Sequence, residues 1–119
     1  MKLKATPYQH FKGGHYLVYG DIQPLPSGLH TSKYSFIAKE SEQTNEVEVI
    51  VTKNGIFYSP FSDETMTLYF SEKTGEWWLR PSEEFHGDKI HEDGTKVQRF
   101  SQRKNEEPAT IVLSLTEYN

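Results

Sequence analysis

Residues 46–58 constrain the fold more than any other part of the chain. Valines stand at every second position of Glu46–Thr52, and a period of two is typical of a strand with one buried face. The pair Asn54-Gly55 follows directly, and type I′ hairpin turns prefer this pair. Residues 56–58 can then form the return strand. The sequence therefore predicts a β-hairpin here.

Short alternating segments separated by turn residues recur along most of the chain. Gly13-Gly14 marks a tight turn, after which Tyr16 and Val18 are expected to share the inward face of a strand. Residues 24–32 read as a loop, and Asp93-Gly94 marks a further turn. Further strands are predicted at residues 33–39, 65–71, 76–81, 89–91, 95–101 and 110–116. Since no long amphipathic helix is encoded, the pattern indicates an all-β fold, either a small SH3-like barrel or a curled antiparallel sheet.

Both tryptophans of the chain lie next to each other within residues 75–85. Side chains two residues apart in a strand share a face, so Trp78 and Arg80 point to one side while Trp77 points to the other. One face can then pack while the other recognises a ligand. Pro81 cannot donate to a sheet ladder and is expected to end the strand. The serine and two glutamates after it are expected to form a capped turn into a short helix.

Size and composition limit the partners and the location of the protein. A chain of 119 residues is expected to form one domain, with a core supplied largely by 7 Phe, 7 Tyr and 2 Trp. Its net charge of −4 argues against nucleic acid or an anionic membrane as a general partner. It has no cysteine, no apolar signal-peptide run and no apolar membrane span. A cytoplasmic protein is therefore expected.

Two hairpin regions resemble each other at an offset of 21 residues. Residues 41–44 and Pro60 bracket one region, and residues 62–65 and Pro81 bracket the other. Each would consist of a polar turn, a strand, a glycine-bearing turn and an aromatic strand ending in proline. The similarity is explained either by an internal duplication or by the shared physical requirements of hairpins.

Three separated motifs follow one another along the chain. They are Tyr8-Gln9-His10-Phe11-Lys12-Gly13 with Tyr16 and Val18, then Trp78-Leu79-Arg80-Pro81 with Phe85, and finally Arg99-Phe100. This order resembles the bacterial and phage family called domain of unknown function 1653, whose members are short β domains. The serine-glutamate-threonine turn of that family is matched by residues 62–65 or equally by residues 41–44. The chain departs from the family through extra residues between Ile22 and Met66 and an extension after Phe100.

The resemblance implies a single domain over residues 1–119. Its core would be residues 8–22 and 62–101, with an inserted hairpin region at 23–61 and a C-terminal strand at 109–117. The family supplies no established activity. Its members occur in phages, where sequestering an immune nucleotide signal in the host cytosol is a role open to small oligomeric proteins. The resemblance thus implies non-catalytic capture of a small anionic ligand, with a nucleotide-derived signal as its sharpest form.

The candidate ligand site combines aromatic and cationic side chains from the three motifs. Trp78 would stack on a base, while Arg80 and its companions would meet phosphate groups. The predicted ligand-binding residues are His10, Lys12, Tyr16, Trp78, Arg80 and Arg99. In the alternative reading these side chains are structural, so that Trp78 fills the core and Arg80 pairs with Glu83 or Glu84 across the turn.

Neither a metal site nor an enzyme is expected. The histidines at positions 10, 15, 30, 86 and 91 match no zinc spacing, and His86, Asp88 and His91 are the one local group of possible ligands. No glycine-flanked nucleophilic serine or phosphate-cradling loop is present, so no catalytic residue and no cofactor is predicted. A late basic group forms either an anion-binding surface or a solvated face among acidic neighbours. It consists of Lys89, Lys96, Arg99, Arg103 and Lys104.

Two further expectations concern partners. The apolar run at residues 110–115 would leave an edge that needs a cover, which predicts a homo-oligomer with edge strands paired across the interface. The alternative to ligand capture is an SH3-like interaction module that docks an extended peptide or an RNA, although the negative charge counts against RNA. Its sequence support is a supply of tyrosines, namely Tyr8, Tyr19, Tyr34, Tyr58, Tyr69 and Tyr118.

Overall fold

The computed structural model describes residues 1–29 and 33–118. Strands make up 55% of the chain and helix 4%, which confirms the all-β expectation. Among the described residues, no helix has the length and apolar character needed to cross a membrane.

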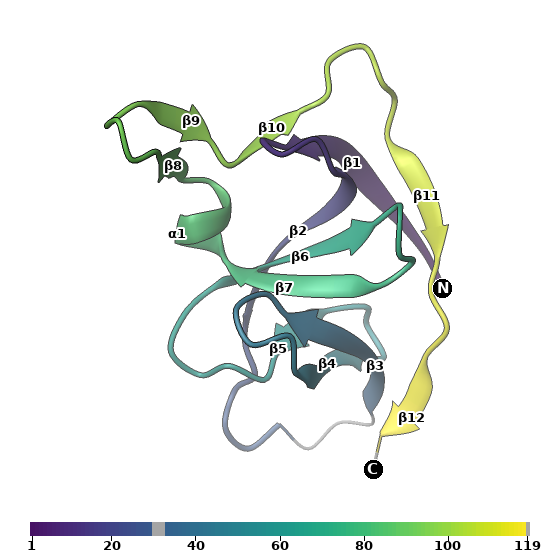
Figure 1. Cartoon of the computed structure of the whole chain (residues 1–119). Helices are drawn as coiled ribbons and strands as arrows, with labels where there is room; N and C mark the ends of the chain where they lie inside the picture. The colour runs from purple at the N-terminus through teal and green to yellow at the C-terminus, as the bar shows by residue number, and fades with distance from the viewer. Residues whose placement is uncertain (30–32, 119) are drawn as a thin grey trace.

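Six strands close into a barrel (Figure 1). Around the ring they follow the order β2 (His15–Pro24), β5 (Phe57–Ser59), β4 (Glu46–Thr52), β3 (Lys33–Glu40), β7 (Trp77–Pro81) and β6 (Met66–Ser71), and β6 returns to β2. The β2–β5 and β3–β7 pairs are parallel. The other four pairs of the ring are antiparallel.

The ring consists of two three-stranded halves with the same pairing pattern. In one half β6 lies between β2 and β7, and in the other β4 lies between β3 and β5, all antiparallel. Both seams between the halves are the parallel pairs. The region predicted as an inserted hairpin supplies the half β3–β4–β5. The two regions that resemble each other in sequence, β4–β5 and β6–β7, occupy equivalent places in the two halves.

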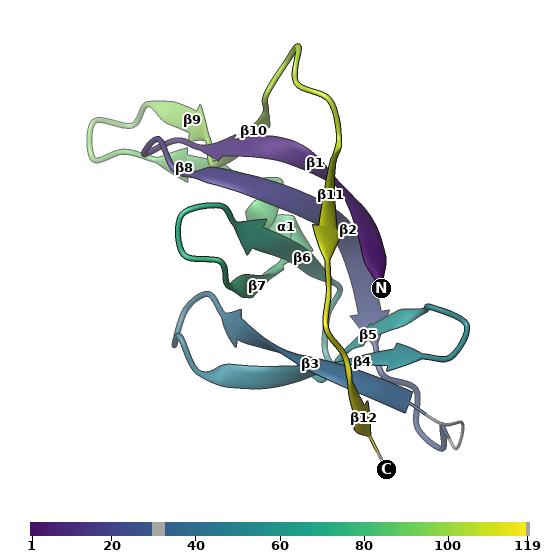
Figure 2. The ribbon, with the colours of Figure 1, turned by 90° about the vertical axis from the view of Figure 1, so that its right-hand side faces the viewer.

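The remaining elements extend the barrel at one end and along one side. β1 (Lys2–His10) pairs with β2, while β10 (Phe100–Gln102) and β11 (Ala109–Val112) pair with β1. The short helix α1 (Ser82–Phe85) follows β7 and leads into a separate hairpin, β8 (Asp88–Ile90) and β9 (Lys96–Gln98). This hairpin projects from the end of the molecule that also holds the β1–β2 turn (Figures 1 and 2).

The C-terminal segment is not the single strand that the sequence predicted. β11 pairs with β1, whereas β12 (Thr116–Tyr118) pairs with β3 on the other half of the barrel. Figure 2 shows the chain running across the barrel between these two strands. Ile111 and Leu113 are both buried in the barrel core, and the Leu113 amide donates to the Met1 carbonyl at 2.8 Å. The burial of these two apolar residues carries the chain from one sheet edge to the next.

The barrel interior holds the main core. Trp77 and Leu79 point into it, while Trp78 and Arg80 lie half-buried on the outer face, so the predicted alternation of this strand is confirmed. β1 contributes Leu3 and Ala5 to this core, and β11 contributes Ile111. The buried members of the core are Leu3, Ala5, Leu17, Ile22, Phe36, Ala38, Val49, Val51, Phe57, Met66, Leu68, Trp77, Leu79, Ile111 and Leu113.

Two local predictions are wrong. Gly55 has a φ of +82°, but Asn54 is not among the described residues with positive φ, so the β4–β5 turn is not type I′. The Gly55 amide instead donates to the Thr52 carbonyl at 2.9 Å, which fits a type I turn closed by a left-handed glycine. The second wrong prediction is the capped turn at the start of α1. Pro81 occupies the N-cap position of α1 and makes no side-chain cap bond, while the Ser82 hydroxyl contacts the Thr67 hydroxyl at 3.0 Å.

Candidate functional site

A second apolar cluster lies on the outer face of β2, β6 and β7, where α1 and β10 cover it. Its buried members are Val18, Tyr69, Phe85 and Phe100, with Tyr8, Tyr16 and Trp78 packed around them. The rings of Phe85 and Phe100 stack with centroids 4.1 Å apart. Tyr16 and Val18 therefore share a face as predicted, but that face meets this second cluster, and their neighbour Leu17 points into the barrel. Both faces of β2 are therefore packed at Leu17 and Val18.

Arg80 is held by three neighbours in this cluster. Its guanidinium lies 5.6 Å from the centroid of the Phe100 ring, its Nε donates to the Tyr69 hydroxyl at 3.3 Å, and its Nη1 forms an ion pair with Glu84. The side chain is only 16% exposed. Burial alone would lower the pKa of Arg80, but Tyr69 and Glu84 together raise it. The ion pair that the structural reading predicted is thus present.

His10 lies beside the same rings, at the end of β1. Its ring centroid is 4.9 Å from that of Phe100 and 6.5 Å from that of Tyr16, both edge-to-face. Its Nδ1 lies 3.2 Å from the Lys12 amide, which donates to it. Burial lowers the pKa of His10, and the charges of Arg80, Arg99 and Lys12 lower it further. His10 is therefore a neutral imidazole with its proton on Nε2, where it is a donor.

Arg99 and Lys12 complete this end of the molecule. The Arg99 amide donates to the Gly87 carbonyl at 3.1 Å, and its carbonyl accepts from the Phe11 amide at 2.9 Å, so its backbone joins β10 to the β1–β2 turn. Its Nε is buried and has no hydrogen-bond partner in the described part of the chain. Within residues 1–29 and 33–118, neither Arg99 nor Lys12 has a carboxylate oxygen within 4.0 Å. Both cations are free of acidic partners there.

The structure brings five of the predicted residues to one place. His10, Tyr16 and Arg80 lie around the Phe100 ring, and the charges of Arg99 and Lys12 act on His10. We call these five residues the basic end. Trp78 packs against the same cluster from β7, but the Lys39 ammonium lies 5.9 Å from the centroid of its ring and is itself paired with Glu76. Stacking of a base on Trp78 would therefore have to displace Lys39.

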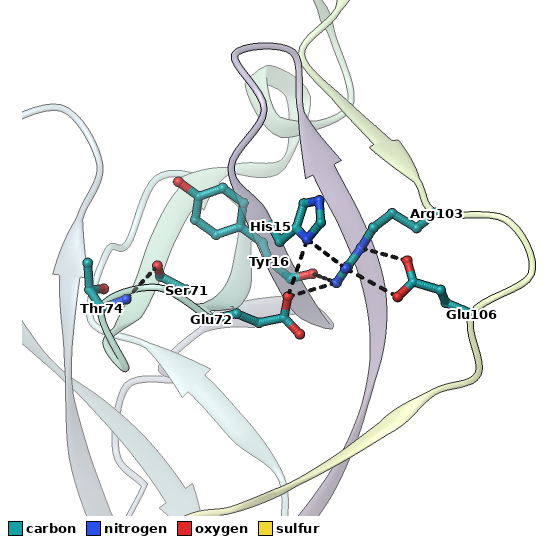
Figure 3. A network of polar contacts seen from close by, with 7 residues as sticks. All are labelled: His15, Tyr16, Ser71, Glu72, Thr74, Arg103 and Glu106. Atoms are coloured by element: carbon teal, nitrogen blue, oxygen red, sulfur yellow. Dashed lines mark hydrogen bonds and ion pairs between the residues drawn. The ribbon is translucent and has the colours of Figure 1, made fainter.

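The sequence placed Arg103 in the late basic group, but the structural role of its side chain was not predicted. Figure 3 shows its guanidinium between carboxylates from two segments, and its side chain is only 10% exposed. It contacts Glu72 Oε2 at 3.0 Å, Glu106 Oε2 at 3.3 Å and His15 Nδ1 at 3.0 Å. These contacts tie the loop after β10 to β2 and to the β6–β7 turn. The glutamate three residues after Arg103 is the sequence signal that could have shown it.

The histidines that the structure describes do not form a metal-binding group. No group of three histidine, aspartate or glutamate side chains suited to a metal ion occurs among the described residues. His86 approaches Asp21 at 3.4 Å, and the His91 ring lies 6.0 Å from that of Phe11. His30 lies outside the described residues.

Comparisons with protein-family models, with curated proteins and with solved structures find no match. The resemblance to domain of unknown function 1653 therefore stays a prediction.

Proposed function

We propose that this protein is a non-catalytic binding module that captures a small anionic ligand at the basic end. A nucleotide-derived molecule is the sharpest form of this proposal, since the basic end offers cations for phosphate groups and the half-buried ring of Tyr16 for a base. Such a protein would act in the cytoplasm, as expected for a bacterial or phage member of the family that it resembles.

The observation that carries this proposal is the pair of uncommitted cations. Lys12 is exposed, and Arg99 is half-buried with its Nε free of any described partner. Arg99, which has no carboxylate partner among the described residues, and Lys12 both act on the His10 imidazole. This concentration of positive charge is unfavourable, and a bound anion would relieve it. Structural arginines elsewhere in the chain, such as Arg103, have carboxylate partners.

Arg80 has a different part in this proposal. Glu84 already occupies its guanidinium, so an anionic ligand would have to displace this carboxylate to bind Arg80 directly. Arg80 therefore contributes positive charge from behind the site and holds Phe100 in place. Replacement of Arg80 by alanine would disturb Glu84 and Tyr69 as well as the ligand, whereas replacement of Arg99 removes no ion pair of the described residues.

The proposal is tested by calorimetric titration of the protein with sodium pyrophosphate and with ADP. The wild-type protein should bind both, and Arg99→Ala should weaken binding by about tenfold or more, the loss of a charge-assisted hydrogen bond. Lys53→Ala is the matched control, because Lys53 is an exposed cation at the β4–β5 turn. The proposal fails if Arg99→Ala and Lys53→Ala bind these anions equally well, or if the wild-type protein binds neither.

A further inference from the structure

The outer face of β3 and β4 carries an apolar groove of about 500 Å³. Ile37 lies in this groove with half of its surface exposed, which is a large exposure for an isoleucine on a central strand. Glu46 and Glu48 line the groove with it. The apolar lining consists of Leu25, Ile37, Val47, Ile50 and Pro60.

Carboxylates dominate the surroundings of this groove. A neighbouring hollow of about 400 Å³ shares Ile37 and Glu48 with it and adds Glu117 from β12. A third hollow, of about 240 Å³, lies at the β3–β4 turn and is lined by Glu40, Glu42 and Glu64 over an apolar floor. The nearby cation Lys39 is already paired with Glu76. This half of the barrel therefore presents negative charge around an apolar surface.

We propose that the groove docks an extended peptide segment of a partner protein, with one aliphatic side chain on Ile37 and lysine or arginine two residues to either side of it, on the same face of the peptide. The aliphatic side chain would cover the exposed surface of Ile37. The flanking cations would meet Glu46 and Glu48, and an acidic peptide would be repelled. The groove lies on β3 and β4, away from the projecting β8–β9 hairpin and the basic end (Figures 1 and 2), so it is a second and separate site.

The probe is a five-residue peptide with blocked ends, lysine-serine-leucine-serine-lysine, which places the leucine and both lysines on one face of an extended chain. It is titrated into the ¹⁵N-labelled protein. The amide signals of Ile37, Val47 and Glu48 should shift and saturate. Two matched peptides, one with serine in place of leucine and one with glutamate in place of lysine, should bind at least about tenfold more weakly. Equal binding of the serine peptide would show that the apolar groove is not used and would overturn the proposal. So would shifts centred on Lys12 and Arg99, or no saturable shift at all.

Variants locate the site. Ile37→Lys should weaken binding of the lysine–leucine peptide by about tenfold or more, and Glu48→Lys should do the same from the rim of the groove. Ile56→Lys is the control, since Ile56 is an equally exposed isoleucine at the β4–β5 turn. If Ile37→Lys and Glu48→Lys both bind the peptide as the wild-type protein does, the groove is not the site. Pyrophosphate titration of the same variants should be unchanged, so failure here is distinguishable from failure of the anion-binding proposal.

Discussion

Burial and the charges of Arg80, Arg99 and Lys12 lower the pKa of His10 below the ordinary 6.5. The folded protein therefore disfavours the protonated form of His10. The unfolded chain therefore binds this proton more tightly than the folded one. The contribution to stability is complete above about pH 6.5 and is lost as the pH falls from there toward the lower pKa of the folded state. The free energy of unfolding should accordingly decrease between pH 7.5 and pH 5.5.

Urea denaturation at these two pH values checks this prediction when the wild-type protein is compared with His10→Gln. The variant should lose less stability on acidification than the wild-type protein does. Asp21 does not interfere, since its pKa lies below the ordinary 3.8: burial raises it, but hydrogen bonds from Thr67, His86 and Ser82 lower it by more. If the free energy of unfolding falls equally in the two proteins, the folded state does not oppose protonation of His10.

At the scale of single elements, the β4–β5 turn gives a prediction that separates two turn types. A type I′ turn needs positive φ at both Asn54 and Gly55, whereas the observed turn needs it at Gly55 alone. Gly55→Ala should therefore lower the free energy of unfolding by about 1 kcal/mol, and Asn54→Ala should change it by a few tenths at most. Denaturant titration of both variants measures this. Comparable losses at both positions would point back to the type I′ turn.

The same hairpin shows which structural features can be predicted from local sequence. The bounds of β4 follow from its valine alternation, because a strand with one buried face repeats every two residues. The turn type does not follow from Asn54-Gly55, since it depends on the hydrogen bond from Gly55 to Thr52. The strand predicted at 110–116 is continuous in sequence, yet residues 110–112 pair with β1 and Thr116 begins β12, which pairs with β3. Only the closed barrel places β1 and β3 where one segment can reach both.

The candidate site was predictable in part for the same reason. Strand periodicity places Trp78 and Arg80 on one face of the sheet. Glu84 follows Arg80 by four residues, so the two side chains can form an ion pair. The sequence therefore allowed Arg80 to be either a ligand-binding residue or a structural partner of Glu84. In the structure Glu84 forms an ion pair with Arg80, whereas Arg99 has no carboxylate partner among the described residues. This difference depends on how β10 and the β1–β2 turn meet. That contact joins segments almost 90 residues apart.

For the whole molecule, the net charge of −4 conceals an uneven distribution. Cations without described acidic partners gather at the basic end, while glutamates surround the groove on β3 and β4. An acidic protein can therefore bind an anion locally, because charges beyond about 8 Å are largely screened at physiological ionic strength.

Self-association through an edge strand stays a prediction at this scale. β11 pairs with β1 along one edge, and no described strand pairs with its other edge, next to which Val112 is 72% exposed. Light scattering should therefore give a multiple of the 13.8 kDa chain mass, and Val112→Lys should shift it toward the monomer, because lysine blunts an open edge. A wild-type mass of 13.8 kDa at high concentration would rule out the oligomer.

Capture of a small anion by Arg99 and Lys12 can be measured on protein purified from cells. Heat denaturation releases whatever the protein has bound, and mass spectrometry identifies and quantifies it. The wild-type protein should release a phosphate-bearing small molecule, and Arg99→Ala, purified in parallel with Lys53→Ala as the control, should release much less of it. If the wild-type protein and Arg99→Ala release the same anions in the same amounts, the basic end does not hold the ligand and the account is contradicted.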